Sequence, residues 1–232
     1  MRSFPPNRNT IMDTRGFLDQ LLKTAQQSAG DLAGSAGIGS GADFGKGALA
    51  GGALTLLLGN RRARKMATLG GLAAVGALAY RAYGDWKRQQ DGASSAATPP
   101  PITSSIAPAL SAPEAETHSQ ALLKALIAAA KADGHVDERE RATIEGEFVR
   151  LDADAETRQW LQAELQKPLD PAEVAAAAAS PELAAQMYAA SVMVVDEQNF
   201  MERAYLDELA RQLKLDDGLK ATLEQQARGA AG

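Results

Sequence analysis

The sequence has no cysteine and only two histidines, His118 and His135. Without thiols it can form no disulfide, thiolate metal site or cysteine nucleophile, and two histidines are too few for a three-histidine metal centre. Aromatic residues make up 5% of the 232 positions, whereas hydrophobic residues as a whole make up 45%. With so few aromatic side chains and so much alanine and glycine, we do not expect a large β-rich core.

Charge is distributed unevenly along the chain. Residues 1–116 carry 12 lysines and arginines against 8 acidic residues, whereas residues 117–232 carry 12 against 21. The basic half suits an anionic membrane surface, and the acidic half is a poor candidate for nucleic acid. We therefore expect membrane lipids, and no nucleic acid, among the partners.

Residues 1–43 are predicted to form an N-terminal tail with one short helix and a glycine-rich hinge at 30–43. Five apolar side chains recur there at helical spacing: Phe17, Leu18, Leu21, Leu22 and Ala25. Polar residues separate them, so the helix is amphipathic. It is expected to lie on its own protein or on a bilayer surface.

Residues 44–88 are predicted to be a membrane segment or hairpin. The uncharged apolar runs 47–59 and 66–80 would rise roughly 20 Å and 22 Å as helices, against about 30 Å for a hydrocarbon core. Glycines could bring helices close enough to self-associate, and they are costly in a water-soluble helix, at about 1 kcal/mol each. These glycines are Gly47, Gly51, Gly52, Gly70, Gly71 and Gly76.

Basic and aromatic residues beside these runs are predicted to sit at the membrane interface: Arg61, Arg62, Arg64, Lys65 and Trp86. If both runs insert, the cluster at 61–65 faces the cytoplasm and both termini lie outside. If only the first run spans, the C-terminal half is cytoplasmic. We favour the second orientation, because Arg81, Lys87 and Arg88 also prefer the cytoplasmic side.

Residues 89–116 are rich in proline, serine, threonine and alanine and are predicted to be a linker. From 117 to 228 the pattern predicts an all-α domain of about seven helices, with capping residues where turns are needed. The predicted caps are Asp137 with Glu140, Asp154, Asp170, Ser180, Asn199 with Glu202, and Asp216 or Asp217. These caps place helix starts at regular intervals through the domain.

The helical domain contains an internal repeat. The residues Glu140-Arg141-Ala142 recur as Glu202-Arg203-Ala204, at an offset of 62 positions. Each copy consists of an apolar helix ending in aspartate, an acidic turn and a capped helix. We therefore expect two helix-turn-helix units packed face to face.

The block ALIAAAKADGHVDERERATI, followed by VMVVDEQNFMERAYLDELARQLKL, resembles the TerB-like helical domain associated with tellurite resistance. The glycine-rich apolar segment ahead of it resembles the YebE-type inner-membrane proteins of bacteria. The resemblance covers residues from about 12 to 228. It implies a compact bundle of about seven helices and a divalent-metal site at the acidic turns. It also implies a link to envelope or metal-oxyanion stress, without an established enzymatic activity.

Carried over to this sequence, the implied metal ligands are Asp133, Glu140, Asp196 and Glu202. Carboxylate oxygens suit Ca²⁺ or Mg²⁺ better than Zn²⁺. The second turn departs from the first, because it is one residue shorter and has Glu197 in place of glycine. We favour the alternative that the two glutamates are capping residues and the two aspartates end helices in solvated turns.

These observations predict a non-enzymatic interaction or sensor module at the bacterial inner membrane, with its helical domain in the cytoplasm. Its acidic domain is expected to bind a protein partner, and the glycine-rich segment to bind a second copy. The alternative is a resistance protein that binds a divalent cation through its acidic turns.

Overall fold

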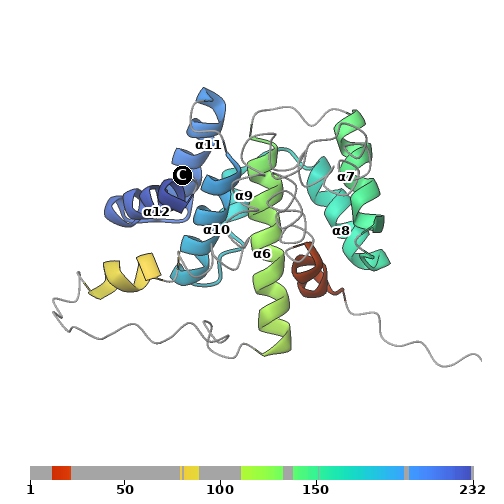
Figure 1. Cartoon of the computed structure of the whole chain (residues 1–232), viewed down its shortest axis with the longest axis horizontal. Helices are drawn as coiled ribbons and strands as arrows, with labels where there is room; N and C mark the ends of the chain where they lie inside the picture. Colours follow the sequence, from red (N-terminus) through yellow and green to blue (C-terminus); the bar gives the residue numbers. More distant parts are fainter. Residues whose placement is uncertain are drawn as a thin grey trace, which may run out of the picture.

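The structure is a computed structural model that describes residues 12–21, 79, 81–88, 111–132, 138–150, 152–195 and 199–230. Every regular element in this part of the chain is a helix (Figure 1), as the sequence predicts. No helix among these residues is long and apolar enough to span a membrane. The six predicted membrane glycines and the basic cluster at 61–65 lie outside the described residues.

Seven helices occupy the described part of the C-terminal half, which confirms the predicted number. They are α6 (Ala112–Ala130), α7 (Glu138–Arg150), α8 (Ala155–Gln166), α9 (Pro171–Ala175), α10 (Pro181–Val194), α11 (Phe200–Gln212) and α12 (Asp217–Ala230). Two further helical stretches, residues 14–21 and 81–88, lie against this bundle (Figure 1).

Capping side chains begin these helices where the sequence places them. The Asp154 carboxylate accepts a hydrogen bond from the Thr157 backbone N–H, and the caps of α9, α10 and α11 are Asp170, Ser180 and Asn199. Asp216, rather than its neighbour, caps α12 by accepting from the Gly218 N–H at 2.9 Å. Asp137, the predicted cap of α7, lies outside the described residues.

Helix α6 begins at Ala112, so the last five residues of the predicted linker are helical. Ser111 and Glu114 form a capping box, in which the Glu114 carboxylate accepts from the Ser111 backbone N–H at 2.9 Å. A proline in the first turn is compatible with a helix, because its missing N–H would have no partner there. Serine and proline, which suggest a linker by composition, are therefore also found at the start of a helix.

The core forms around α10, which packs against α6 and α12. Nearly every α10 residue from Leu183 onward is buried, as expected of a helix that is apolar on all sides. Tyr188, Leu161 and Leu223 are among the largest side chains that are fully buried. Four residues from outside the predicted domain join the same core: Phe17, Leu18, Ala79 and Ala82.

The predicted repeat is a structural one, and it is longer than two helices. Residues 138–150 of α7 correspond to 200–212 of α11, and α8 and α12 begin at 155 and 217, so both pairs are offset by 62 positions. α6 and α10 pack against each other, as expected for two units that meet face to face. Each unit therefore consists of three helices, with α9 between the units.

The turns that end α7 and α11 are equivalent in detail. Asp152 and Lys214 both have φ of 55°, in the left-handed region, and they are 62 positions apart. In each turn the next N–H donates to the carbonyl five residues earlier at 3.1 Å, which is the helix-ending geometry of a Schellman motif. The match confirms that the two units share backbone geometry as well as sequence.

Candidate functional site

The predicted metal ligands lie only partly within the described residues. Asp133 and Asp196 lie outside them, and Glu140 is described only as a backbone position of α7. Glu202 lies in the first turn of α11. Among the described side chains there is no group of three or more acidic or histidine residues that could hold a metal ion. The metal site therefore stays a prediction for the two turns.

Several side-chain hydrogen bonds hold the helix at 14–21 against the bundle. The backbone N–H groups of Thr14 and Arg15 donate to the two oxygens of the Glu116 carboxylate, at 2.8 and 3.2 Å. The Thr14 hydroxyl donates to the same carboxylate. Asp13 accepts from the Gly16 N–H at 2.7 Å and donates its own N–H to Asp154. An anion at a helix N-terminus is favourable, so Glu116 of α6 anchors this helix.

Apolar contacts bury the other face of this helix. The Phe17 ring meets the Phe148 ring of α7 edge to face, with centroids 5.7 Å apart. Phe17 is 5% exposed and Phe148 is 4% exposed. This confirms that the described part of the amphipathic helix lies on its own protein, because Phe17 and Leu18 are buried in the core of the bundle.

The helix at 81–88 docks on the other unit. The Trp86 indole N–H donates to the Asp216 carboxylate at 3.0 Å, and the Trp86 side chain packs partly buried against the core. Ala82 is fully buried. Tyr83 lies beside Trp86, with ring centroids 5.6 Å apart. Trp86, predicted to anchor the chain at a bilayer interface, therefore has a partner within the protein.

The two docking contacts are equivalent in the repeat. Asp154 and Asp216, 62 positions apart, cap α8 and α12 and also accept a hydrogen bond from the N-terminal half of the chain. The pKa of Asp216 is lowered, first by the Trp86 hydrogen bond and then by the Gly218 N–H. Burial opposes a low pKa at Asp154, but hydrogen bonds from Thr157 outweigh it and the pKa is lowered.

Replacing Asp216 by alanine is expected to lower the free energy of unfolding by about 0.5–2 kcal/mol, the usual cost of losing a helix cap. It also removes the acceptor of the Trp86 indole. In a Trp160→Phe background, in which Trp86 is the remaining tryptophan, emission should shift to longer wavelength. Asp154→Ala is the matched control, since it removes the equivalent cap and should leave Trp86 emission unchanged. An equal shift in both variants would contradict the assigned contact.

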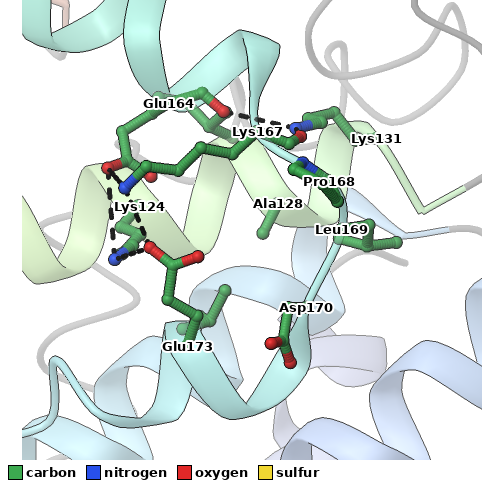
Figure 2. A pocket seen from close by; sticks show the side chains of 11 residues that line it. Lys124, Ala128, Lys131, Glu164, Lys167, Pro168, Leu169, Asp170 and Glu173 are labelled. Atoms are coloured by element: carbon green, nitrogen blue, oxygen red, sulfur yellow. Dashed lines mark hydrogen bonds and ion pairs between the residues drawn. The ribbon is translucent and has the colours of Figure 1, made fainter.

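A second polar cluster joins α6, α8 and α9 (Figure 2). The Lys167 ammonium lies 2.6 Å from a Glu164 oxygen and 2.8 Å from a Glu173 oxygen, and Lys124 lies 2.9 Å from the same Glu173 oxygen. Lys131 donates to the backbone carbonyls of Glu164, at 3.2 Å, and of Lys167. The charges thus pair with one another across three helices.

This cluster holds the helices together and has no room for a substrate. The cavity among its side chains is about 20 Å³, the space of a water molecule. Burial lowers the pKa of Lys131, whereas hydrogen bonds to Glu164 and Glu173 raise that of Lys167. Hydrogen bonds from Lys167 and Lys124 lower the pKa of Glu173 to about 2. We name Lys124, Lys131, Glu164, Lys167 and Glu173 the lysine clamp.

The lysine clamp predicts a pH dependence of stability. Because the pKa of Glu173 falls from 4.5 to about 2 on folding, its contribution is present above pH 4.5 and is lost as the pH falls towards 2. The urea midpoint of Glu173→Gln should therefore lie below that of the wild type at pH 7, with the gap closing between pH 4.5 and 2. A gap that stays constant over this range would contradict the assignment.

Sequence patterns alone did not predict these contacts, because the residues that form them are far apart in the chain. Thr14 and Glu116 are 102 positions apart, Trp86 and Asp216 are 130 apart, and Lys124 and Glu173 are 49 apart. The available signals were local: Lys124 and Lys131 lie two turns apart on one helix, and Glu164 and Lys167 lie one turn apart. Such spacings are also common on solvated helix faces.

Two comparisons with known proteins match part of this chain. The family model described as "Protein of unknown function (DUF533)" matches residues 43–227. A Yersinia enterocolitica protein, described as "Uncharacterized protein in ampR 5'region", is 34% identical over 109 residues, covering 47% of this chain and 78% of that protein. No solved structure matches the chain. The family match includes both the glycine-rich segment and the helical bundle.

Proposed function

We propose, from the premise that this chain belongs to the TerB-like family DUF533, that it is a membrane-associated protein without enzymatic activity. In this proposal the glycine-rich segment binds the bilayer of a bacterial inner membrane. The helical bundle is an interaction module on the cytoplasmic side. The TerB-like resemblance suggests that it serves in envelope or metal-oxyanion stress.

The observation that carries this proposal is that the helices flanking the apolar segment are part of the bundle. Phe17 and Leu18 precede the segment, Ala79 and Ala82 lie at its end, and all four are buried in one core with α6 and α10. The bundle is therefore joined to the apolar segment by packed helices on both sides. The same pairing of segment and bundle falls within one family match.

Two exposed apolar side chains on the described surface support a binding role. The cavity of the lysine clamp has the size of a water molecule, and its charged groups are paired with one another. By contrast, Phe200 is 75% exposed and Met201 is 58% exposed, side by side at the start of α11. Adjacent exposed apolar side chains of this size are typical of surfaces that contact other proteins.

Flotation with lipid vesicles tests the membrane proposal. The full chain, reconstituted from mild detergent into vesicles of phosphatidylethanolamine and phosphatidylglycerol, should float and should resist extraction at alkaline pH. Leu56→Lys with Leu57→Lys places two charges in the first apolar run and should lower the floating fraction at least tenfold, since each is costly in hydrocarbon. A wild-type chain that stays in the aqueous fraction would overturn the proposal.

The matched control places the same two charges on the bundle. Gln159 and Gln162 are exposed on α8, so Gln159→Lys with Gln162→Lys adds two lysines without entering an apolar run. This variant should float like the wild type. Equal loss in both double variants would mean that added charge, rather than insertion of residues 47–59, controls association, and the proposal would then fail.

A further inference from the structure

We propose that copies of this chain associate head to tail through their helical bundles, with Phe200 and Met201 of one copy seated in a groove between α7 and α8 of the next. We name these two side chains the apolar pair and this hollow the α7–α8 groove. The inference rests on the proposed interaction role of the bundle and names a second copy as its partner. It concerns the described bundle alone.

The α7–α8 groove has a volume of about 510 Å³. Helix α7 lines it mainly with small or apolar residues, among them Gly146, Phe148 and Val149. Val149 is 60% exposed, and a Cβ placed on Gly146 would meet no other part of the protein within 4 Å. Phe148 lies at the buried side of the groove, where its ring also meets Phe17. The groove is therefore an open hollow of the size that binding sites have.

The repeat gives a direct comparison with the same surface of the second unit. The positions equivalent to Gly146 and Val149, 62 residues further along, are Glu208 and Arg211. The side chains of Glu208 and Arg211 form an ion pair across one turn of α11. Because the two units share backbone geometry, it is the side chains that make the surface of the first unit apolar and hollow.

Two groups of opposite charge, Glu145 and Arg158, also line the groove. Their equivalents in the second unit, Asp207 and Lys220, form an ion pair of 2.6 Å. Among the described residues, by contrast, neither Glu145 nor Arg158 has an ion-pair partner. One charge of each sign is therefore available at the groove for side chains of another molecule.

The apolar pair is the second feature that the repeat leaves unmatched. Phe200 is 75% exposed and Met201 is 58% exposed at the start of α11, whereas α7 begins with the charged residues 138–139. The residues that follow the pair, Glu202 and Arg203, again carry one charge of each sign. The pair and its neighbours thus complement the groove in both apolar character and charge.

The pair and the groove of one bundle cannot meet each other. Figure 1 shows α11 on the opposite side of the bundle from α7 and α8, with α6 between them. A contact between the two features therefore joins two copies. Because it uses different surfaces on the two partners, each copy keeps one free pair or groove, and further copies can add in the same way.

The size of the apolar pair indicates a weak contact. An aromatic side chain buries about 150–250 Å² when it is covered completely, so the exposed parts of the pair supply roughly 250 Å². A stable interface takes about 800 Å² from each partner. We therefore expect association where copies are concentrated, as they are when they share one membrane surface.

Cross-linking of single cysteines tests the contact, because the natural chain has none. Ala204→Cys lies one turn after Phe200, and Gln159→Cys lies on the α8 side of the groove; both positions are exposed. The two full-length variants, one carrying a longer tag, are mixed and reconstituted into the same vesicles at rising density. A short bismaleimide is added, and the tag separates the mixed dimer from the two like dimers by gel electrophoresis.

The mixed dimer of Ala204→Cys with Gln159→Cys should be the main product. Ala221→Cys is the matched control, because it occupies the exposed position of α12 that is equivalent to Gln159. Paired with Ala204→Cys, it should give about tenfold less mixed dimer, since its surroundings are charged rather than apolar. Equal yields for Gln159→Cys and Ala221→Cys would overturn the proposal.

Two further variants remove the contact from each side. Phe200→Ser with Met201→Ser removes the apolar pair from the Ala204→Cys chain. Gly146→Glu with Val149→Arg gives the groove of the Gln159→Cys chain the ion pair of the second unit. All four substitutions are at exposed positions, so circular dichroism should show an unchanged fold. Each variant should lower the mixed dimer about tenfold, because buried apolar area is lost; an unchanged yield for either would overturn the proposal.

Flotation of the same samples separates this inference from the proposed membrane function. A chain that floats without an excess of mixed dimer would overturn the head-to-tail contact and leave the membrane function standing. If the chain stays in the aqueous fraction, the same mixture is cross-linked in concentrated solution. Mixed dimers there would support the contact while the membrane function fails, and their absence would overturn both.

Discussion

Replacing Phe17 with alanine is expected to lower the free energy of unfolding of the full chain by about 3–5 kcal/mol. Phe17 is 5% exposed and meets Phe148 edge to face, although 131 positions separate them in the sequence. Truncation removes buried apolar area and leaves a cavity between the helix at 14–21 and α7. The size of this loss measures how firmly the N-terminal helix belongs to the bundle.

The measurement is urea unfolding of the full chain in mild detergent, followed by circular dichroism at 222 nm and by tryptophan fluorescence. Gln20→Ala is the control, because Gln20 is exposed on the same helix and its loss should cost no more than about 0.5 kcal/mol. In a double-mutant cycle, Phe17→Ala and Phe148→Ala should couple by about 0.5–1.5 kcal/mol. A loss below about 1 kcal/mol for Phe17→Ala would contradict the packing of Phe17 against Phe148.

Leu161→Ala and Leu223→Ala are each expected to lower the free energy of unfolding by about 2–5 kcal/mol. The two leucines occupy equivalent positions, 62 apart, on α8 and α12, and each is 1% exposed. Because the two leucines are equally buried in units of the same backbone geometry, the two substitutions should lower the free energy of unfolding by similar amounts. Both units contribute to one core, so either substitution should lower the stability of the whole bundle.

Urea unfolding of both variants tests this prediction, with Gln159→Ala on α8 and Gln225→Ala on α12 as exposed controls. The two leucine variants should each unfold in one transition, detected at the same urea concentration by both probes. A variant that unfolds in two steps would contradict a single cooperative core. It would mean instead that the two three-helix units unfold independently.

Local signals in the sequence were sufficient to predict most of the helical architecture. Caps such as Asp154, Ser180 and Asn199 act within one helical turn, so their positions alone predict helix starts. The repeat is also visible directly in the amino-acid sequence, and the bounds of α7 and α11 differ by its offset of 62 positions. The start of α6 was missed, because proline and serine favour a linker as well as the first turn of a helix.

The candidate sites depended on contacts that no local pattern specifies. Tryptophan is a residue type common at bilayer interfaces. Only the tertiary structure reveals that the Trp86 indole N–H donates to Asp216. The lysine clamp likewise unites residues whose charges, taken helix by helix, are typical of solvated surfaces. The acidic turns remain a prediction from resemblance, because Asp133 and Asp196 lie outside the described residues.

The sequence by itself determined an all-α C-terminal domain, the starts of most of its helices and the presence of two related units. These features follow from periodicity and capping, which operate over a few residues. Only the tertiary structure decided that the helices on both sides of the apolar segment dock on one bundle. That arrangement depends on pairs such as Thr14 with Glu116 and Trp86 with Asp216, more than 100 positions apart, which are brought together by burial of a shared core.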